Sequence, residues 1–137
     1  MYLFIHTCDD KTLTLALFSK SMEYKKKIVL KKIFHKNILL ESLEKFLKKE
    51  KVKPKDLEGI LCVKGPGKFS QVRLGVAVAN TLSWFLNISI AEIVKDEIPK
   101  EQKLLWNFLK NKISSSQKKH YIVEPHYGGE PNITMKK

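Results

Sequence analysis

Residues 64–75 read KGPGKFSQVRLG, and this stretch decides the fold that the sequence predicts. Residues 60–63 (ILCV), just before it, form a continuous apolar run of the kind found in buried parallel strands. Residues 69–86, which begin inside it, carry apolar side chains on every side of a helix, with Arg73 as the only charge. Gly65-Pro66-Gly67 therefore predicts a turn from a buried strand into a buried helix.

The same turn has an alternative use as an anion site. Backbone N–H groups at the start of a helix can hold a phosphate. The P-loop pattern GxxxxGK[ST] is absent, however, and Pro66 removes one backbone donor. We therefore favour a rigid turn that sets the angle between strand and helix, and keep the phosphate site as the alternative.

Apolar periodicity outward from this turn predicts an α/β domain with a mixed sheet of about five strands and helices packed on it. Upstream, three short β-prone segments joined by polar turns predict an antiparallel meander. The expected strands are residues 2–7, 13–18, 24–33, 60–63 and 88–93, with a short one at 121–123, and the expected helices are 37–51, 69–86 and 100–113. We expect residues 1–113 to form one lobe and residues 114–137 to form a linker and an extended tail.

Two of these helices carry more apolar surface than one sheet can cover. The apolar residues of 37–51 span ~200° of the helix, unless lysine stems cover part of that arc. Residues 74–91 contain no charge, and the small residues Gly75, Ala77 and Ala79 would admit a close neighbour. We expect a second chain to cover the remaining surface. The expected partner-facing residues are Leu39, Leu43, Phe46, Phe69, Val72, Arg73, Val76 and Leu82.

The formal net charge is +12, and of the 26 basic residues only Arg73 is an arginine. A surface of solvated lysines explains most of this charge, because nucleic-acid and phosphate sites favour arginine. A lone arginine indicates a position where lysine would not serve, such as a bidentate contact. The alternative is a basic RNA-binding module that uses the lysines at 25–27, 31 and 32.

Catalytic and metal-binding patterns are missing from the sequence. It contains no HExxH or GxSxG motif, and His120 and His126 have poor spacing for a metal site. Cys8 and Cys62 stand apart with no CxxC, and the polar residues within 74–91 argue against a membrane span. We expect a cytoplasmic protein with no cofactor, no metal and no catalytic residues; a peptidase or kinase-like enzyme is the least favoured alternative.

Residues 65–75 resemble the signature G-P-G-S-F-T-G-L-R-I-G of the TsaB (YeaZ) family. The matching residues are Gly65, Pro66, Gly67, Phe69, Arg73 and Gly75. Ser70, Val72 and Leu74 replace similar residues, whereas Lys68 and Gln71 depart from the pattern. The resemblance extends over about residues 1–95 through the order of elements, and His35 matches a histidine that the family often has before its first helix.

The resemblance implies one lobe of the actin/Hsp70-like, ribonuclease H-like fold, in a short form lacking most of the second lobe. It also implies a scaffold that binds and activates a TsaD-type protein through a helical bundle during threonylcarbamoyl (t6A) modification of tRNA. TsaD carries the metal, the nucleotide and the transfer chemistry, and a TsaE-type ATPase joins the complex. Transfer RNA would be contacted mainly through that complex, and a homodimer through the same helices is an alternative. His6 stands where this superfamily has a metal-binding Asp, which argues against a nucleotide role.

Overall fold

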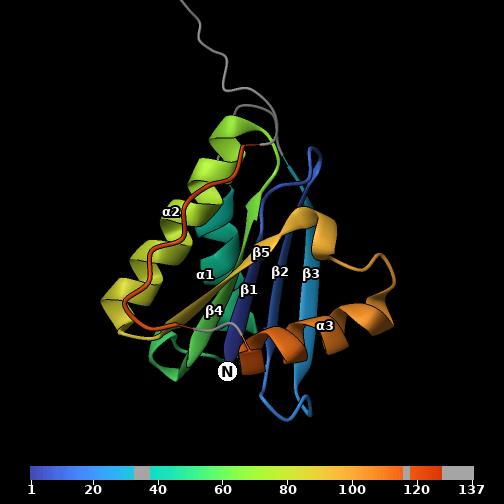
Figure 1. The fold of residues 1–137 in the computed structure, drawn as a ribbon. Coiled ribbons are helices and arrows are strands. Elements are labelled where there is room, and N and C mark those ends of the chain that lie inside the picture. Colours follow the sequence, from blue (N-terminus) through green and yellow to red (C-terminus); the bar gives the residue numbers. More distant parts are fainter. Residues whose placement is uncertain (33–37, 116–117, 128–137) are drawn as a thin grey trace, which may run out of the picture.

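The described part of the chain folds into a mixed five-stranded sheet with three α-helices (Figure 1). The computed structural model describes residues 1–32, 38–115 and 118–127, so His35 lies outside the described residues. The strands are β1 (Tyr2–His6), β2 (Thr12–Phe18), β3 (Lys25–Lys31), β4 (Gly59–Gly65) and β5 (Ser89–Val94). The helices are α1 (Leu39–Lys49), α2 (Phe69–Leu86) and α3 (Gln102–Ser115), and short 3-10 turns cover Pro54–Asp56 and Lys95–Glu97.

The sheet order is β3-β2-β1-β4-β5. β1, β2 and β3 pair antiparallel, as the predicted meander requires, whereas β1–β4 and β4–β5 pair parallel. A parallel pair needs a long crossover, and α1 and α2 supply the two crossovers. The predicted α/β fold with a mixed five-stranded sheet is therefore confirmed.

The helices cover both faces of the sheet. The Cys62 Sγ approaches the Gly75 carbonyl on α2 at 3.8 Å, and the Phe18 ring meets the Trp106 ring of α3 edge-on at 6.1 Å between centroids. Alternation along the paired strands places Cys62 and Phe18 on opposite faces. In Figure 1, α3 accordingly crosses in front of the sheet while α1 lies behind it.

The C-terminal part departs from the prediction in two respects. The expected strand at 121–123 is wrong, because these residues have no strand pairing; one isolated bridge joins Lys118 to Ile90 instead. α3 also runs to Ser115, two residues into the expected linker. Among the described residues, no helix combines the length and the apolar character needed to cross a membrane.

Lysines from two distant segments hold the turn between β1 and β2. Lys32 donates to the Thr7 and Asp9 carbonyls, and Lys95 Nζ lies 3.3 Å from Asp9 Oδ1. His6, at the end of β1, is 7% exposed and accepts a hydrogen bond from the Cys8 N–H. Burial, together with the charges of Lys95 and Lys32, lowers the pKa of His6 to about 4 against the opposing effect of Asp9. His6 is therefore neutral in the folded protein at neutral pH.

This histidine predicts a loss of stability in mild acid. Because the unfolded chain binds a proton at His6 near pH 6.5 and the folded chain only near pH 4, the free energy of unfolding falls as the pH drops through this window. We expect a loss of about 2 kcal/mol between pH 7 and pH 5. Urea titrations of the native chain and of His6→Gln measure it, with His120→Gln as the exposed control. An equal pH dependence in native chain and His6→Gln would contradict the assignment.

Candidate protein interface on helix α2

The turn that leads into α2 requires glycine at two positions. Gly65 has φ +129°, and a Cβ there would lie 1.8 Å from the His126 carbonyl oxygen. A Cβ on Gly67 would lie 2.8 Å from the Cys8 carbonyl oxygen. The Gly65–Pro66 peptide bond is cis. The segments around His126 and Cys8 therefore pack directly against this turn.

Gly75 lets α2 lie close to Thr7 of the same chain. A Cβ on Gly75 would lie 2.4 Å from Thr7 Oγ1, and Thr7 Oγ1 donates to the Gln71 carbonyl at 2.7 Å. The expectation that Gly75 and Ala79 admit a partner helix is therefore wrong, because both residues face the chain's own core. Of the three small residues, Ala77 alone is exposed.

Five of the eight expected partner-facing side chains are buried in the chain's own core. They are Leu39, Leu43 and Phe46 on α1, with exposed fractions of 2%, 5% and 2%, and Val72 and Val76 on α2, with 0% and 3%. These residues form the apolar stripes that pack on the sheet, and they offer no surface to a partner. The other three are accessible: Phe69 and Arg73 are exposed and Leu82 is half-buried.

One flank of α2 is covered by residues 118–127, which we call the strap. The strap runs along the helix as the red trace in Figure 1. Asn80 holds its middle with two hydrogen bonds: Nδ2 donates to the Val123 carbonyl and Oδ1 accepts from the Val123 N–H, both at 2.9 Å. Val123 is 1% exposed. Val123 therefore belongs to the core, and the expected extended tail docks on its own lobe over this length.

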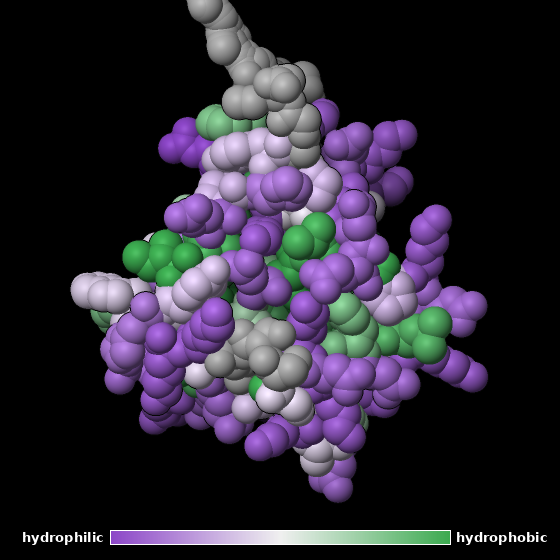
Figure 2. All heavy atoms as spheres, in the orientation of Figure 1, coloured by the Kyte–Doolittle hydropathy of each residue, from purple (hydrophilic) through white to green (hydrophobic). Residues whose placement is uncertain are grey.

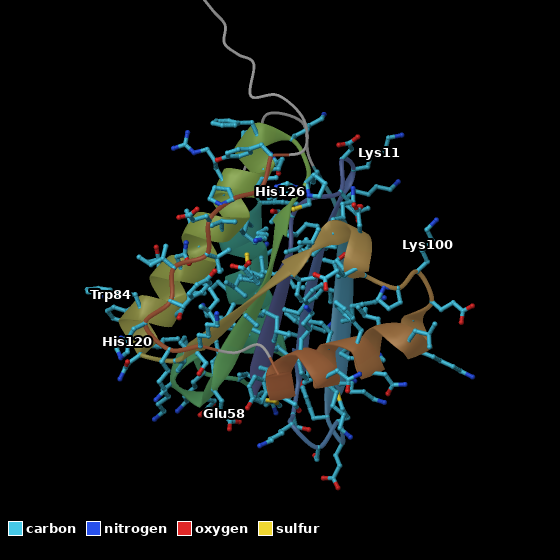
Figure 3. All side chains as sticks on the ribbon, in the orientation of Figure 1. Lys11, Glu58, Trp84, Lys100, His120 and His126 are labelled. Atoms are coloured by element: carbon cyan, nitrogen blue, oxygen red, sulfur yellow. The ribbon has the colours of Figure 1, made fainter. Side chains whose placement is uncertain are left out.

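The two ends of the strap are fixed to the sheet and the turn. Near its beginning, Tyr121 donates from its hydroxyl to Glu92, which also pairs with Lys64. Burial acts to raise the pKa of Glu92, but the hydrogen bonds from Lys64 and Tyr121 outweigh it and leave that pKa below its usual value. Near its end, the His126 N–H donates to the Lys64 carbonyl at 2.7 Å. Figure 3 shows His120 and His126 toward opposite ends of α2.

Asn80→Ala is expected to release the middle of the strap. The change leaves the buried N–H and carbonyl of Val123 without their partners, at a cost of about 1–3 kcal/mol. Hydrogen exchange at the Val123 amide should then accelerate about tenfold or more. Thr81→Ala, an exposed change one residue further along α2, is the control. Unchanged exchange at Val123 would show that the strap does not depend on Asn80.

The only arginine lies in a stack of three side chains at the start of α2. The Tyr127 ring stacks on the Phe69 ring with centroids 4.5 Å apart, and the Arg73 guanidinium lies 5.2 Å from the centre of the Phe69 ring. Lysine would make a poorer stack, because it lacks the planar group of arginine. This arrangement accounts for arginine at this position and leaves its N–H groups at the exposed surface.

The opposite end of α2 exposes large apolar side chains. Trp84 is 81% exposed and Phe85 is 76% exposed. Figure 3 shows Trp84 pointing away from the ribbon, near His120, and Figure 2 shows strongly hydrophobic side chains reaching the surface on the same side of the molecule. Ile122 of the strap is 72% exposed, and Leu40 of α1 is 58% exposed. Exposed apolar surface of this kind is typical of an interface.

Both cysteine thiols are buried. Burial raises the pKa of the Cys8 thiol to about 11 and raises that of the Cys62 thiol as well, so both are protonated at neutral pH. Among the described residues, no group of three or more His, Cys, Asp or Glu side chains could hold a metal ion.

Sequence reasoning missed the strap and the exposed end of α2 as parts of one surface. The sequence pattern places Trp84 and Phe85 only within the apolar helix predicted at residues 69–86. The pairing of Asn80 with Val123 joins residues 43 positions apart, and no local pattern signals it.

The sequence comparisons match proteins that are named for threonylcarbamoyl modification of tRNA. The family model described as "TsaD: tRNA N6-adenosine threonylcarbamoyltransferase" matches residues 30–95. A Bacillus subtilis protein named "tRNA threonylcarbamoyladenosine biosynthesis protein TsaB" is 48% identical over 40 residues, which are 29% of this chain and 18% of that protein. A Buchnera aphidicola protein of the same name is 36% identical over 72 residues, which are 49% of this chain and 34% of that protein.

The solved structures agree on the fold. YeaZ from Pseudomonas aeruginosa superposes with a TM-score of 0.60 at 20% identity, over 68% of this chain and 43% of that one. A second structure, described as similar to peptidase YeaZ from the same organism, superposes with a TM-score of 0.61 over 68% of this chain and 42% of that one. This chain therefore spans less than half the length of the relatives that it matches. By sequence over stretches of 40 and 72 residues, and by fold over 68% of its length, the chain is similar to proteins named TsaB and YeaZ.

Proposed function

We propose that this chain is a non-catalytic subunit in the t6A modification of tRNA, and that it binds and activates a TsaD-type protein through α2 and the neighbouring part of α1. The names of the curated relatives and the matching family model support this pathway. The observation that carries the binding role is the exposed apolar end of α2, with Trp84 and Phe85 each more than 70% exposed.

The geometry supports this use of α2 in three ways. The inner side of α2 packs on the sheet and one flank carries the strap. The remaining surface of α2 is therefore a single face bounded by the sheet and the strap. Arg73 stands on that surface, held by the Phe69 ring, and can donate to a partner carboxylate. Leu40 of α1 is also exposed, on the flank of that helix away from β3, because the β3 side of α1 is lined by Ser42, Lys45 and Lys49.

Reconstitution with the TsaD-type protein of the same genome tests the proposal. The two chains should co-elute in gel filtration at micromolar concentration. Formation of t6A in tRNA, measured by mass spectrometry of nucleosides, should require both chains and, if present in the pathway, the TsaE-type ATPase. A chain that neither co-elutes with the TsaD-type protein nor changes t6A formation would refute the function. Self-association in place of complex formation would support the homodimer alternative.

A further inference from the structure

The outer edge of β3 is an open sheet edge with its backbone groups facing outward. β3 is the terminal strand of the sheet in the part of the chain that the structure describes. Ser19 N donates to the Tyr24 carbonyl and Lys32 N donates to the Lys11 carbonyl, so even-numbered residues of this segment turn their backbone toward β2. By antiparallel geometry, the N–H and C=O groups of the odd-numbered residues point away from the sheet. These residues are Lys25, Lys27, Val29 and Lys31.

This edge carries a high positive charge. Four of the seven residues of β3 (KKKIVLK) are lysines. Lys25, Lys27 and Lys31 share one face of the sheet with Val29, which is 53% exposed, and Lys26 is on the other face. Lysines on an edge strand prevent two copies of the same edge from pairing. They do not oppose an acidic strand, so the charge selects the kind of partner.

An apolar groove lies beside the same edge. It has a volume of about 390 Å³ and runs between β3 and α1. Ile28 and Leu30 of β3 supply one wall, and Ile38 and Phe46 supply apolar surface from the α1 side. Its charged lining residues are Lys31, Lys45, Lys49 and Glu41, and the carboxylate of Glu41 pairs with Lys45 at 2.9 Å. The lining thus has an excess of positive charge.

We propose that the β3 edge binds an extended acidic segment of a partner protein by strand addition. The added strand would pair with the outward N–H and C=O groups of the odd-numbered residues. Its side chains opposite Ile28 and Leu30 would enter the groove, and those on the other face would lie beside Lys25, Lys27 and Lys31. Alternating acidic and apolar residues match this surface. The site is separate from the α2 interface and does not depend on the proposed function.

A seven-residue peptide with alternating Glu and Val, labelled with fluorescein, is the probe. Fluorescence anisotropy should show saturable binding to the full chain at low salt, and binding should weaken at least tenfold when Lys replaces Glu in the peptide. An N-methylated acidic peptide, which lacks the pairing donors, should also bind at least tenfold more weakly. In NMR spectra, the acidic peptide should slow hydrogen exchange at the amides of Lys27, Val29 and Lys31.

Two variants separate backbone pairing from charge. Val29→Pro removes one outward N–H without removing a hydrogen bond to β2, and should weaken binding about tenfold. The pair Lys27→Glu and Lys31→Glu should do the same. Its control is the pair Lys103→Glu and Lys110→Glu on α3, which makes the same change in net charge at exposed positions and should alter binding less than twofold.

Four results of the peptide experiments would overturn the proposal. They are no saturable binding of the acidic peptide, equal binding of the Lys and Glu peptides, protection mapped outside β3, and full binding by Val29→Pro that remains folded by circular dichroism. Displacement of the peptide by a uridine oligonucleotide that binds the same lysines more tightly would instead assign the edge to RNA. If the oligonucleotide does not displace the peptide, the result supports an acidic segment as the occupant of this edge.

Discussion

Gly65→Ala is expected to lower the free energy of unfolding by about 3 kcal/mol or more and to detach the end of the strap. The φ of +129° is a conformation that alanine rarely adopts, and the new methyl group would lie 1.8 Å from the His126 carbonyl oxygen. The backbone of the strap must move to relieve this overlap. That movement breaks the 2.7 Å hydrogen bond from His126 N–H to the Lys64 carbonyl and separates Tyr127 from Phe69.

A second background separates the two contributions to this loss. In a chain that ends at residue 117, the overlap with His126 is absent and only the backbone strain at residue 65 remains, worth about 1–3 kcal/mol. Urea unfolding of the full-length and the truncated chain, each with and without Gly65→Ala, gives the cost of the substitution in the presence and in the absence of the strap. Hydrogen exchange at the His126 amide reports the strap directly in the full-length pair. Equal costs of Gly65→Ala in both backgrounds would show that the strap does not rest on this glycine.

The elements of the sheet could be predicted from sequence because each has its own local signal. Residues 69–86 were predicted as a helix and form α2 over those same residues, since Gly65-Pro66-Gly67 marks the entry and Asn87 takes the left-handed conformation that ends the helix. The buried run at 60–63 extends to Gly59 and Gly65, and Gly65 meets the backbone of His126. Local chemistry thus determines where elements start and stop.

The neighbours of each element could not be predicted in the same way. Helical periodicity placed Leu43 and Val76 on apolar stripes, but periodicity does not say whether a sheet or a partner covers a stripe. A partner assignment was made for residues that the sheet covers. The strap is the converse case, because an extended segment has no period and its middle is held by Asn80, which is far away in sequence.

This correction also decides which substitutions can test the interface. A charge at Leu43, which is 5% exposed, would unfold the core and stop binding for that reason alone. Trp84 and Phe85 are 81% and 76% exposed, so their replacement tests binding with little effect on folding. Lysine is the suitable replacement, because a positive charge is favourable near the C-terminus of a helix whereas aspartate is not.

The double variant Trp84→Lys and Phe85→Lys is expected to weaken binding of a TsaD-type protein at least a hundredfold, equivalent to about 3 kcal/mol. Two aromatic side chains would no longer be buried, and two charges would enter an apolar contact. The matched control is Leu104→Lys on α3, which lies across the sheet from α2 and is 50% exposed. It should bind like the native chain. Calorimetric titration gives the affinity, and thermal unfolding checks that all three chains are equally folded. Native affinity in the folded double variant would exclude this end of α2 from the interface, and loss of self-association in the variant would show that two copies of the chain meet there instead.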